Sequence, residues 1–359
     1  MHGTRRSFGR TIALGSLAGA APAVLDRGNG LAESKPNPSK LKLAVGYSTD
    51  EMRIAIAKSF GIQHVTAFTD LTDDNLRALT SQSARHGMTV SYASRNSDWG
   101  SIVLNLPGRE KAIDEFNRQT IALGKAGIRN RQTYFYATGV LLTHLAETSG
   151  GLLTRAFSTN RPPDPKLSYQ RAAEWPLARK YSAEEIWDNY TYFVRKAAPV
   201  AEDANVRISI HPEDPPGLEY FNEPRVIASS FEGYKRALEI ANSPNIGMCL
   251  CSGCVLEAGE RWGKDIVETI KYFGARNKIF KVHLRNVSSP LPEFHETWLD
   301  DGYYDMYKII KALREVNNDC IISMDHWPGS RQKEYGLTGW VRCATYAKAL
   351  LDRANKEAG

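Results

Sequence analysis

The feature that most constrains the fold is an alternation of short apolar segments with longer amphipathic ones, which runs from about residue 41 to the end of the chain. Short runs rich in β-branched and aromatic residues are typical of strands, and apolar residues repeating every three to four positions are typical of helices. The predicted strands are 41–47, 64–68, 89–93, 131–138, 206–211, 246–251, 279–286 and 320–325. The predicted helices that follow them are 50–60, 73–86, 109–125, 183–202, 231–241, 265–273, 305–316 and 337–356. Eight consecutive strand–helix units predict a (β/α)8 TIM barrel, formed by residues 41–359 as a single domain. A doubly wound sheet is the alternative, but no glycine-rich nucleotide fingerprint follows the first strand.

Residues 1–40 stand outside this alternation. Arg5 and Arg6 precede Phe8, a weakly apolar stretch and the small residues 21–23. This order resembles a twin-arginine export signal with its cleavage site. We therefore expect residues 1–40 to be an export signal and linker, and the mature protein to be periplasmic. A disordered basic tail is the alternative.

The segment 140–181 is the second departure, because it is too long for an ordinary strand-to-helix connection in such a barrel. It carries Arg155, Arg161, Arg171, Arg179 and Trp175. We interpret this segment as a lid insertion over the barrel mouth. A docked surface excursion or an oligomer contact is the alternative.

Charge and hydropathy narrow the classes of partner. The chain has 46 Lys and Arg against 40 Asp and Glu, a net charge of +6. No dense basic stripe with interleaved aromatic residues is present, which argues against a nucleic-acid partner. No apolar run reaches the roughly 18–20 residues of a membrane helix, so we expect no membrane association of the mature form. A small anionic substrate and a homo-oligomer are both compatible with this composition.

The last four predicted strands each have one apolar face and one polar or small-residue face, because successive side chains point to opposite sides. The polar faces end at His211, Cys251, His283 and Asp325, at the C-terminal strand ends where TIM-barrel active sites are built. Two imidazoles, a thiolate and a carboxylate predict one divalent cation, a transition metal such as Mn, Fe or Zn rather than Ca. Taken singly, each residue has a plainer interpretation as a buried core side chain. Four of them at equivalent heights favour a metal site.

The cysteines allow competing interpretations. Cys249, Cys251 and Cys254 form a C-x-C-x-x-C pattern, but an iron–sulfur or zinc knuckle would need a fourth cysteine nearby. Cys320 begins a strand at the other end of the barrel, and Cys343 lies within a helix. A disulfide between Cys251 and Cys254 stays open as an alternative in an oxidising compartment.

Several stretches of the sequence resemble D-mannonate dehydratases of the metal-dependent TIM-barrel type. These stretches are 210–216, 250–253, 282–287, 305–306, 324–326 and 335–337. The resemblance covers about residues 180–356, and the N-terminal half is divergent. It implies that the four strand-end residues above are the metal ligands and that His326 and Tyr335 form the acid–base pair. The expected cofactor is one divalent transition metal, with Mn²⁺ and Fe²⁺ the preferred candidates.

Three further polar residues are candidates for substrate binding. Arg285 shares the inward face with His283, and its guanidinium could hold a substrate carboxylate by two hydrogen bonds. An ion pair with a neighbouring acid is the alternative. Asn286 and Glu213 are predicted to contact the substrate or to support the metal ligands.

The expected activity is that of a metal-dependent lyase that dehydrates a sugar acid. The resemblance implies conversion of D-mannonate to 2-keto-3-deoxy-D-gluconate. Removing the C2 proton builds negative charge beside the carboxylate, which a divalent cation stabilises. We expect Tyr335 to take this proton and His326 to serve the leaving hydroxyl; the reverse assignment and purely structural roles are alternatives. The alternative functions are a sugar isomerase or epimerase on the same barrel and a non-catalytic exported carbohydrate-binding barrel.

Overall fold

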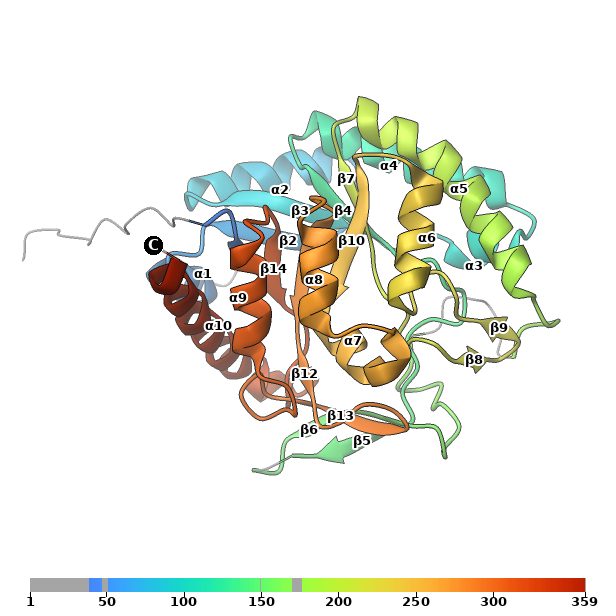
Figure 1. Cartoon of the computed structure of the whole chain (residues 1–359). Coiled ribbons are helices and arrows are strands. Elements are labelled where there is room, and N and C mark those ends of the chain that lie inside the picture. Colours follow the sequence, from blue (N-terminus) through green and yellow to red (C-terminus); the bar gives the residue numbers. More distant parts are fainter. Residues whose placement is uncertain (1–38, 47–50, 149, 170–175, 359) are drawn as a thin grey trace, which may run out of the picture. The chain divides into compact units, whose positions relative to one another are not determined.

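The computed structural model describes residues 39–46, 51–148, 150–169 and 176–358. Eight parallel strands form one sheet in the order β3-β2-β1-β14-β11-β10-β7-β4. Their bounds are β1 (Lys42–Gly46), β2 (His64–Phe68), β3 (Thr89–Ser94), β4 (Asn130–Thr133), β7 (Arg207–Ile210), β10 (Ile246–Cys251), β11 (Ile279–Leu284) and β14 (Ile321–Met324). The sheet curls into a nearly closed barrel with helices around it (Figure 1), which confirms the predicted TIM barrel. The predicted export signal lies outside the described residues.

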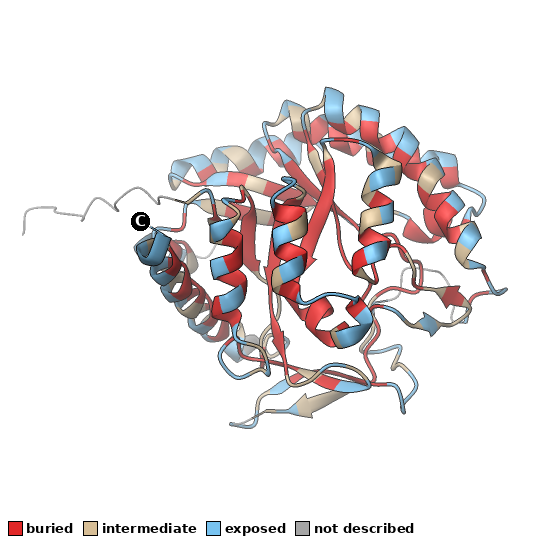
Figure 2. Ribbon diagram, viewed as in Figure 1, coloured by how far each residue is buried: buried red, intermediate tan, exposed pale blue. Residues whose placement is uncertain are grey.

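The outer helices follow the predicted segments closely. They are α1 (Glu51–Ser59), α2 (Asp73–Arg85), α4 (Arg109–Lys125), α5 (Ala183–Asp203), α6 (Phe231–Ala241), α8 (Ile266–Gly274), α9 (Met306–Glu315) and α10 (Gly336–Ala358). Ser182 and Glu185 cap α5 reciprocally, each side chain accepting from the other's backbone N–H. Buried residues occupy the helix faces turned toward the barrel, and exposed ones face outward (Figure 2). No helix in the described part of the chain is long and apolar enough to cross a membrane.

Side chains hold β3 against β4, the two strands at the ends of the sheet order. Asn130 Nδ2 donates to the Ser91 carbonyl at 2.9 Å, and Ser94 Oγ donates to the Gln132 carbonyl at 3.3 Å. These bonds take the place of a regular ladder at the closure of the barrel.

The barrel axis is filled by polar side chains rather than left open. Lys281 Nζ lies 3.5 Å from both the Tyr92 ring centroid and Gln132 Oε1, and Cys249 Sγ lies 3.5 Å from the same oxygen. These residues come from four different strands, and all are buried. Cys249 and Lys281 therefore point inward, on the same strand faces as Cys251 and His283.

A second, antiparallel sheet lies at the C-terminal end of the barrel strands (Figure 1). Its order is β12 (Asn286–Val287), β13 (Glu293–Thr297), β6 (Leu153–Ser158) and β5 (His144–Glu147). Strands β5 and β6 belong to the long segment after β4, whereas β12 and β13 follow β11. The predicted insertion thus pairs with a loop about 140 residues further along the chain. A small hairpin, β8 (Glu219–Tyr220) with β9 (Glu223–Pro224), follows β7.

Several elements differ from those predicted. The strand predicted at 131–138 ends at Thr133, because the Glu223 carboxylate accepts hydrogen bonds at 2.6 Å from the backbone N–H groups of Ala137 and Thr138. The strand predicted at 279–286 is interrupted at Arg285, between β11 and β12. The short helices α3 (Trp99–Leu104) and α7 (Ser252–Ala258) are additional to the predicted set.

Candidate active site

The four strand-end residues predicted as metal ligands meet at one end of the barrel. His211 follows β7, Cys251 ends β10, His283 lies on β11, and Asp325 follows β14. Ligand atoms of His211, Cys251 and His283 all lie within 4.8 Å of one another. Asp325 completes the group, with one carboxylate oxygen 3.6 Å from Cys251 Sγ and the other 3.4 Å from His283 Nδ1.

The protonation states of this group suit metal binding. His211 Nδ1 donates to the Pro212 carbonyl at 2.6 Å, which leaves Nε2 with a free lone pair. Burial, followed by the charge of Lys281, lowers the pKa of His283 to about 4, so its imidazole is neutral near pH 7. Burial opposes ionisation of Cys251, but a hydrogen bond from Cys254 and the charge of Arg285 hold its pKa well below the ordinary value.

These donors fit one divalent transition metal. Neutral imidazoles, a thiolate and a carboxylate are ligands for Mn, Fe or Zn. His283 Nδ1 is buried and has no hydrogen-bond partner among the described residues, so it is available to a cation. His211, Cys251, His283 and Asp325 are therefore the residues that would hold the metal.

Arg285 lies beside the four residues and is 1% exposed. Its Nε is 3.1 Å from Asp325, and its Nη1 is 2.7 Å from both Glu257 and Glu296. Its Nη2 lies 3.6 Å from Asp214 Oδ2, 3.5 Å from Cys251 Sγ and 3.2 Å from Cys254 Sγ. The guanidinium nitrogens face acids and sulfurs of the chain itself, which is the ion-pair alternative given above. A contact of this guanidinium with substrate stays a prediction.

A glycine makes room for this arginine. A Cβ at Gly253, in the first turn of α7, would collide with the Arg285 guanidinium. Ser252 helps to fix the same backbone, since its Oγ donates to the Arg285 carbonyl at 2.7 Å and accepts from the Arg285 N–H at 2.9 Å. The Cys251-to-Cys254 segment therefore forms the wall against which Arg285 packs.

His326 is held between the barrel and the antiparallel sheet. Its Nδ1 lies 3.0 Å from Glu296 Oε1 on β13 and 3.0 Å from Arg155 Nη1 on β6. Its Nε2 is 3.5 Å from Asp325 Oδ1. The Arg155 Nη2 also donates to the Tyr169 phenol at 2.8 Å. The structure thus places His326 next to the predicted metal ligands.

Tyr335 lies at the rim, in a 3₁₀ turn directly before α10, and its side chain has no hydrogen-bond or ion-pair partner in the described part of the chain. It is 43% exposed. Gly329 has a positive φ of 76°, and a Cβ there would approach Tyr335 Cβ to 2.9 Å. The turn that returns the chain to the rim therefore depends on glycine.

The two other predicted substrate contacts are buried. The Asn286 amide donates to the Leu299 and Tyr304 carbonyls at 3.1 and 2.8 Å, which fastens the loop after β11. Glu213 accepts from the Ile227 N–H at 3.2 Å, and burial raises its pKa to about 8. Their predicted contacts with substrate stay predictions.

The sequence interpretation missed Glu296 and treated Arg155 only as one of several basic residues of the insertion. Both lie on the antiparallel sheet and reach His326 from strands that are far apart in sequence. Alternation along 293–297 could have marked Glu296 as facing opposite to its neighbour His295. No local pattern indicates that β13 pairs with β6.

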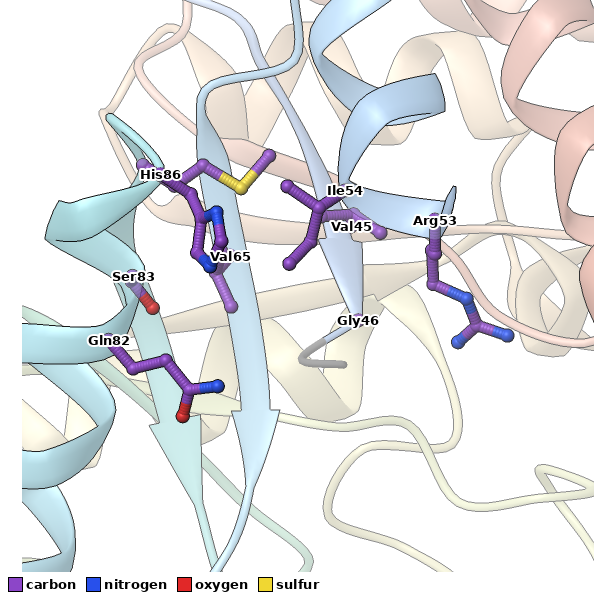
Figure 3. Close-up of a pocket in the computed structure, with 9 residues that line it drawn as sticks. Val45, Gly46, Arg53, Ile54, Val65, Gln82, Ser83 and His86 are labelled. Carbon is purple, nitrogen blue, oxygen red and sulfur yellow. The ribbon is translucent and has the colours of Figure 1, made fainter. Parts of the chain in front are cut away.

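A small cavity between the first two strand–helix units contains none of these residues (Figure 3). Val45, Ile54 and Val65 form its apolar walls, with His86 and Arg53 at the side. At about 20 Å³ it has room for roughly one water molecule. We assign it no part in the chemistry.

Comparison with known proteins agrees with this geometry. Residues 154–358 match the family model described as D-mannonate dehydratase (UxuA). Mannonate dehydratase of Thermotoga neapolitana is 31% identical over 310 residues, 76% of this chain and 83% of the relative. That of Oceanobacillus iheyensis is 27% identical over 311 residues, 78% of this chain and 85% of the relative. The crystal structure of mannonate dehydratase from Streptococcus suis serotype 2 superposes with a TM-score of 0.75 at 23% identity, covering 89% of this chain and 96% of that one.

Proposed function

Because the chain belongs to the D-mannonate dehydratase (UxuA) family and is a hydro-lyase of that family, we propose that it converts D-mannonate to 2-keto-3-deoxy-D-gluconate and water. The observation that carries this proposal is the convergence of His211, Cys251, His283 and Asp325 at the catalytic end of the barrel, directly beside His326. A metal held there would supply a Lewis acid for the oxygens beside C2. We propose Mn²⁺ or Fe²⁺, since the mixed donor set suits both ions.

His326 and Tyr335 are proposed to move the two protons of the elimination. Loss of the C2 proton and departure of the C3 hydroxyl, which leaves as water, give an enol that becomes the 2-keto acid. The exposed phenol of Tyr335 is available to substrate, and the His326 ring is held beside Asp325. We keep Tyr335 on the C2 proton and His326 on the hydroxyl as the working assignment.

Arg155 is proposed to bind the substrate carboxylate. Its side chain reaches the barrel mouth from β6, its Nη2 contacts an exposed tyrosine, Tyr169, and its Nε is buried without a hydrogen-bond partner among the described residues. A guanidinium in this position can form charge-assisted bonds with an entering anion. Arg285, in contrast, already faces several acids.

The decisive test is a substrate screen of the metal-loaded protein. Formation of 2-keto-3-deoxy acids would be measured with D-mannonate, with epimeric aldonates and with the corresponding aldoses and ketoses. We expect product from D-mannonate and none after chelation. Isomerised or epimerised sugars without any 2-keto-3-deoxy acid would refute the proposal in favour of the isomerase alternative.

We also propose that the protein is exported to the periplasm, which rests on the sequence of residues 1–40 alone. Cell fractionation of the full chain and of an Arg5→Lys, Arg6→Lys variant tests this. Equal amounts of both proteins in the periplasm would contradict the proposal.

A further inference from the structure

Glu296 has no part in the reaction as described so far, yet it is the acid nearest to His326. Its Oε1 lies 3.0 Å from His326 Nδ1, and the residue is 2% exposed. It reaches this position because β13 pairs with β6 across the end of the barrel, with Phe294 opposite Phe157 and His295 opposite Ala156. An ionised carboxylate can only accept a hydrogen bond, so it favours the ring tautomer that carries its proton on Nδ1.

The Glu296 carboxylate stays ionised in this setting despite its burial. Burial opposes ionisation, but the charges of Arg285 and Arg155 and the hydrogen bond from His326 hold its pKa below the ordinary value. Arg285 Nη1 lies 2.7 Å from the oxygen that faces His326. The same guanidinium reaches Asp325 through Nε at 3.1 Å, so Glu296 and a predicted metal ligand share one cation.

Arg155 competes for the same ring nitrogen. Its Nη1 is 3.0 Å from Nδ1 and would donate to it, which requires Nδ1 to be bare and the proton to sit on Nε2. Arg155 has a second acceptor in the Tyr169 phenol, whereas among the described residues Nδ1 and Arg285 are the N–H donors to Glu296 Oε1. A charge-assisted N–H to carboxylate bond is also stronger than donation to a neutral nitrogen.

We propose that Glu296 is the positioning residue of His326: its carboxylate accepts a hydrogen bond from Nδ1 of the imidazole and so fixes the orientation in which Nε2 faces Asp325 and the substrate. This rests on the proposed role of His326 in proton transfer. Glu296 itself does not touch the substrate; it acts by fixing the orientation and tautomer of the ring. Losing such a partner typically costs about 10–100-fold in activity.

The structure offers a matched control for the substitution Glu296→Gln. Glu257 lies at the same 2.7 Å from Arg285 Nη1 and is 0% exposed, but it makes no contact with His326 in the described residues. Glu257→Gln therefore removes the other carboxyl group that contacts Arg285 Nη1 and leaves Nδ1 with Glu296. A change of the His326 ring signal that is specific to Glu296→Gln is an effect on His326.

The test is ¹⁵N NMR of the histidine rings in Zn²⁺-loaded protein, with His326→Asn to assign the signal. We expect the Nδ1–H tautomer in the wild type and in Glu257→Gln, and mixed tautomers in Glu296→Gln. The kcat for 2-keto-3-deoxy acid formation should fall about 10–100-fold in Glu296→Gln, with KM and metal content near the wild-type values. A wild-type ring protonated on Nε2, or identical spectra and kcat values for the two glutamine variants, would overturn the proposal. The wild-type spectrum decides the tautomer even if a variant fails to fold, and absence of product from D-mannonate would refute the proposed function without changing that result.

Discussion

Replacing Arg285 by methionine tests the electrostatics of the site most directly. The substitution keeps an unbranched apolar stem but removes the cation that Asp214, Glu257, Glu296 and Asp325 share. These acids are all nearly buried, so water cannot replace the lost charge. We therefore expect a large loss of stability in metal-free protein.

The size of the effect follows from the burial. Removing one partner of a buried ion pair typically costs about 3–5 kcal/mol, because an uncompensated charge stays in the interior. For a folded body of this length, that corresponds to a fall in melting temperature of about 4–7 °C. Arg353→Met is the matched control, since Arg353 pairs with Glu357 on the surface of α10 with 62% of its side chain exposed. Its loss should leave the melting temperature within experimental error of the wild type.

The pH dependence gives the same experiment a second readout. Burial raises the pKa of Glu257 well above its ordinary value, and the charge of Arg285 opposes this rise. A carboxyl whose pKa is raised by folding contributes stability below its unfolded-state pKa of about 4.3 and loses it as the pH rises. Without Arg285 this loss becomes larger, so the gap between Arg285→Met and the wild type should widen from pH 5 to pH 8.

Urea denaturation of EDTA-treated protein at several pH values measures both effects without adding salt. An unchanged free energy of unfolding in Arg285→Met, combined with a raised KM for the sugar acid, would refute the electrostatic reasoning. That outcome would instead identify the guanidinium as the carboxylate clamp that the sequence predicts.

Cys251→Ser should abolish metal retention measured by mass spectrometry, because a serine hydroxyl does not ionise as a thiol does. The control Cys343→Ser, within the outer helix α10, should retain the metal. Tyr335→Phe should lower kcat about 100-fold with metal content unchanged. The control Tyr192→Phe, on the outer helix α5, should leave kcat unchanged. Near-normal turnover in Tyr335→Phe would eliminate the proposed proton transfer. Burial, followed by the charge of Lys42, lowers the pKa of His64, so this residue contributes stability above pH 6.5 that is lost as the pH falls. His64→Gln should therefore flatten the decline in the free energy of unfolding between pH 7 and pH 5. An unchanged dependence of that free energy on pH would contradict this.

The barrel could be predicted from sequence because its signals are local. Each strand–helix unit closes within a few tens of residues, and alternation along a strand already separates the inward Cys249 and Lys281 from their apolar neighbours. The same alternation predicts that the four strand-end residues meet, since parallel strands of a barrel end at the same face, and the structure places them together. The pattern along each strand was therefore sufficient to predict that these four residues converge.

The antiparallel sheet could not be predicted in this way. Strands β6 and β13 are short, and their pairing joins segments about 140 residues apart, so neither segment carries a signal of its partner. The shortened β4 has a similar origin, because the carboxylate that satisfies the N–H groups of Ala137 and Thr138 belongs to Glu223, in the distant β9.

Arg285 shows why a residue can be located correctly while its partners stay unknown. Parity predicts that it follows His283 on the inward face. Whether its charge is free depends on three acids: Asp214 in the loop after β7, Glu257 on α7 and Glu296 on β13. Glu296 is the member of this group that also reaches His326. By pairing with β13, the long insertion therefore holds in place the acid that we propose to orient His326. It follows that shortening the β5–β6 hairpin should impair proton transfer before it impairs metal binding, since all four predicted metal ligands lie on or directly after barrel strands.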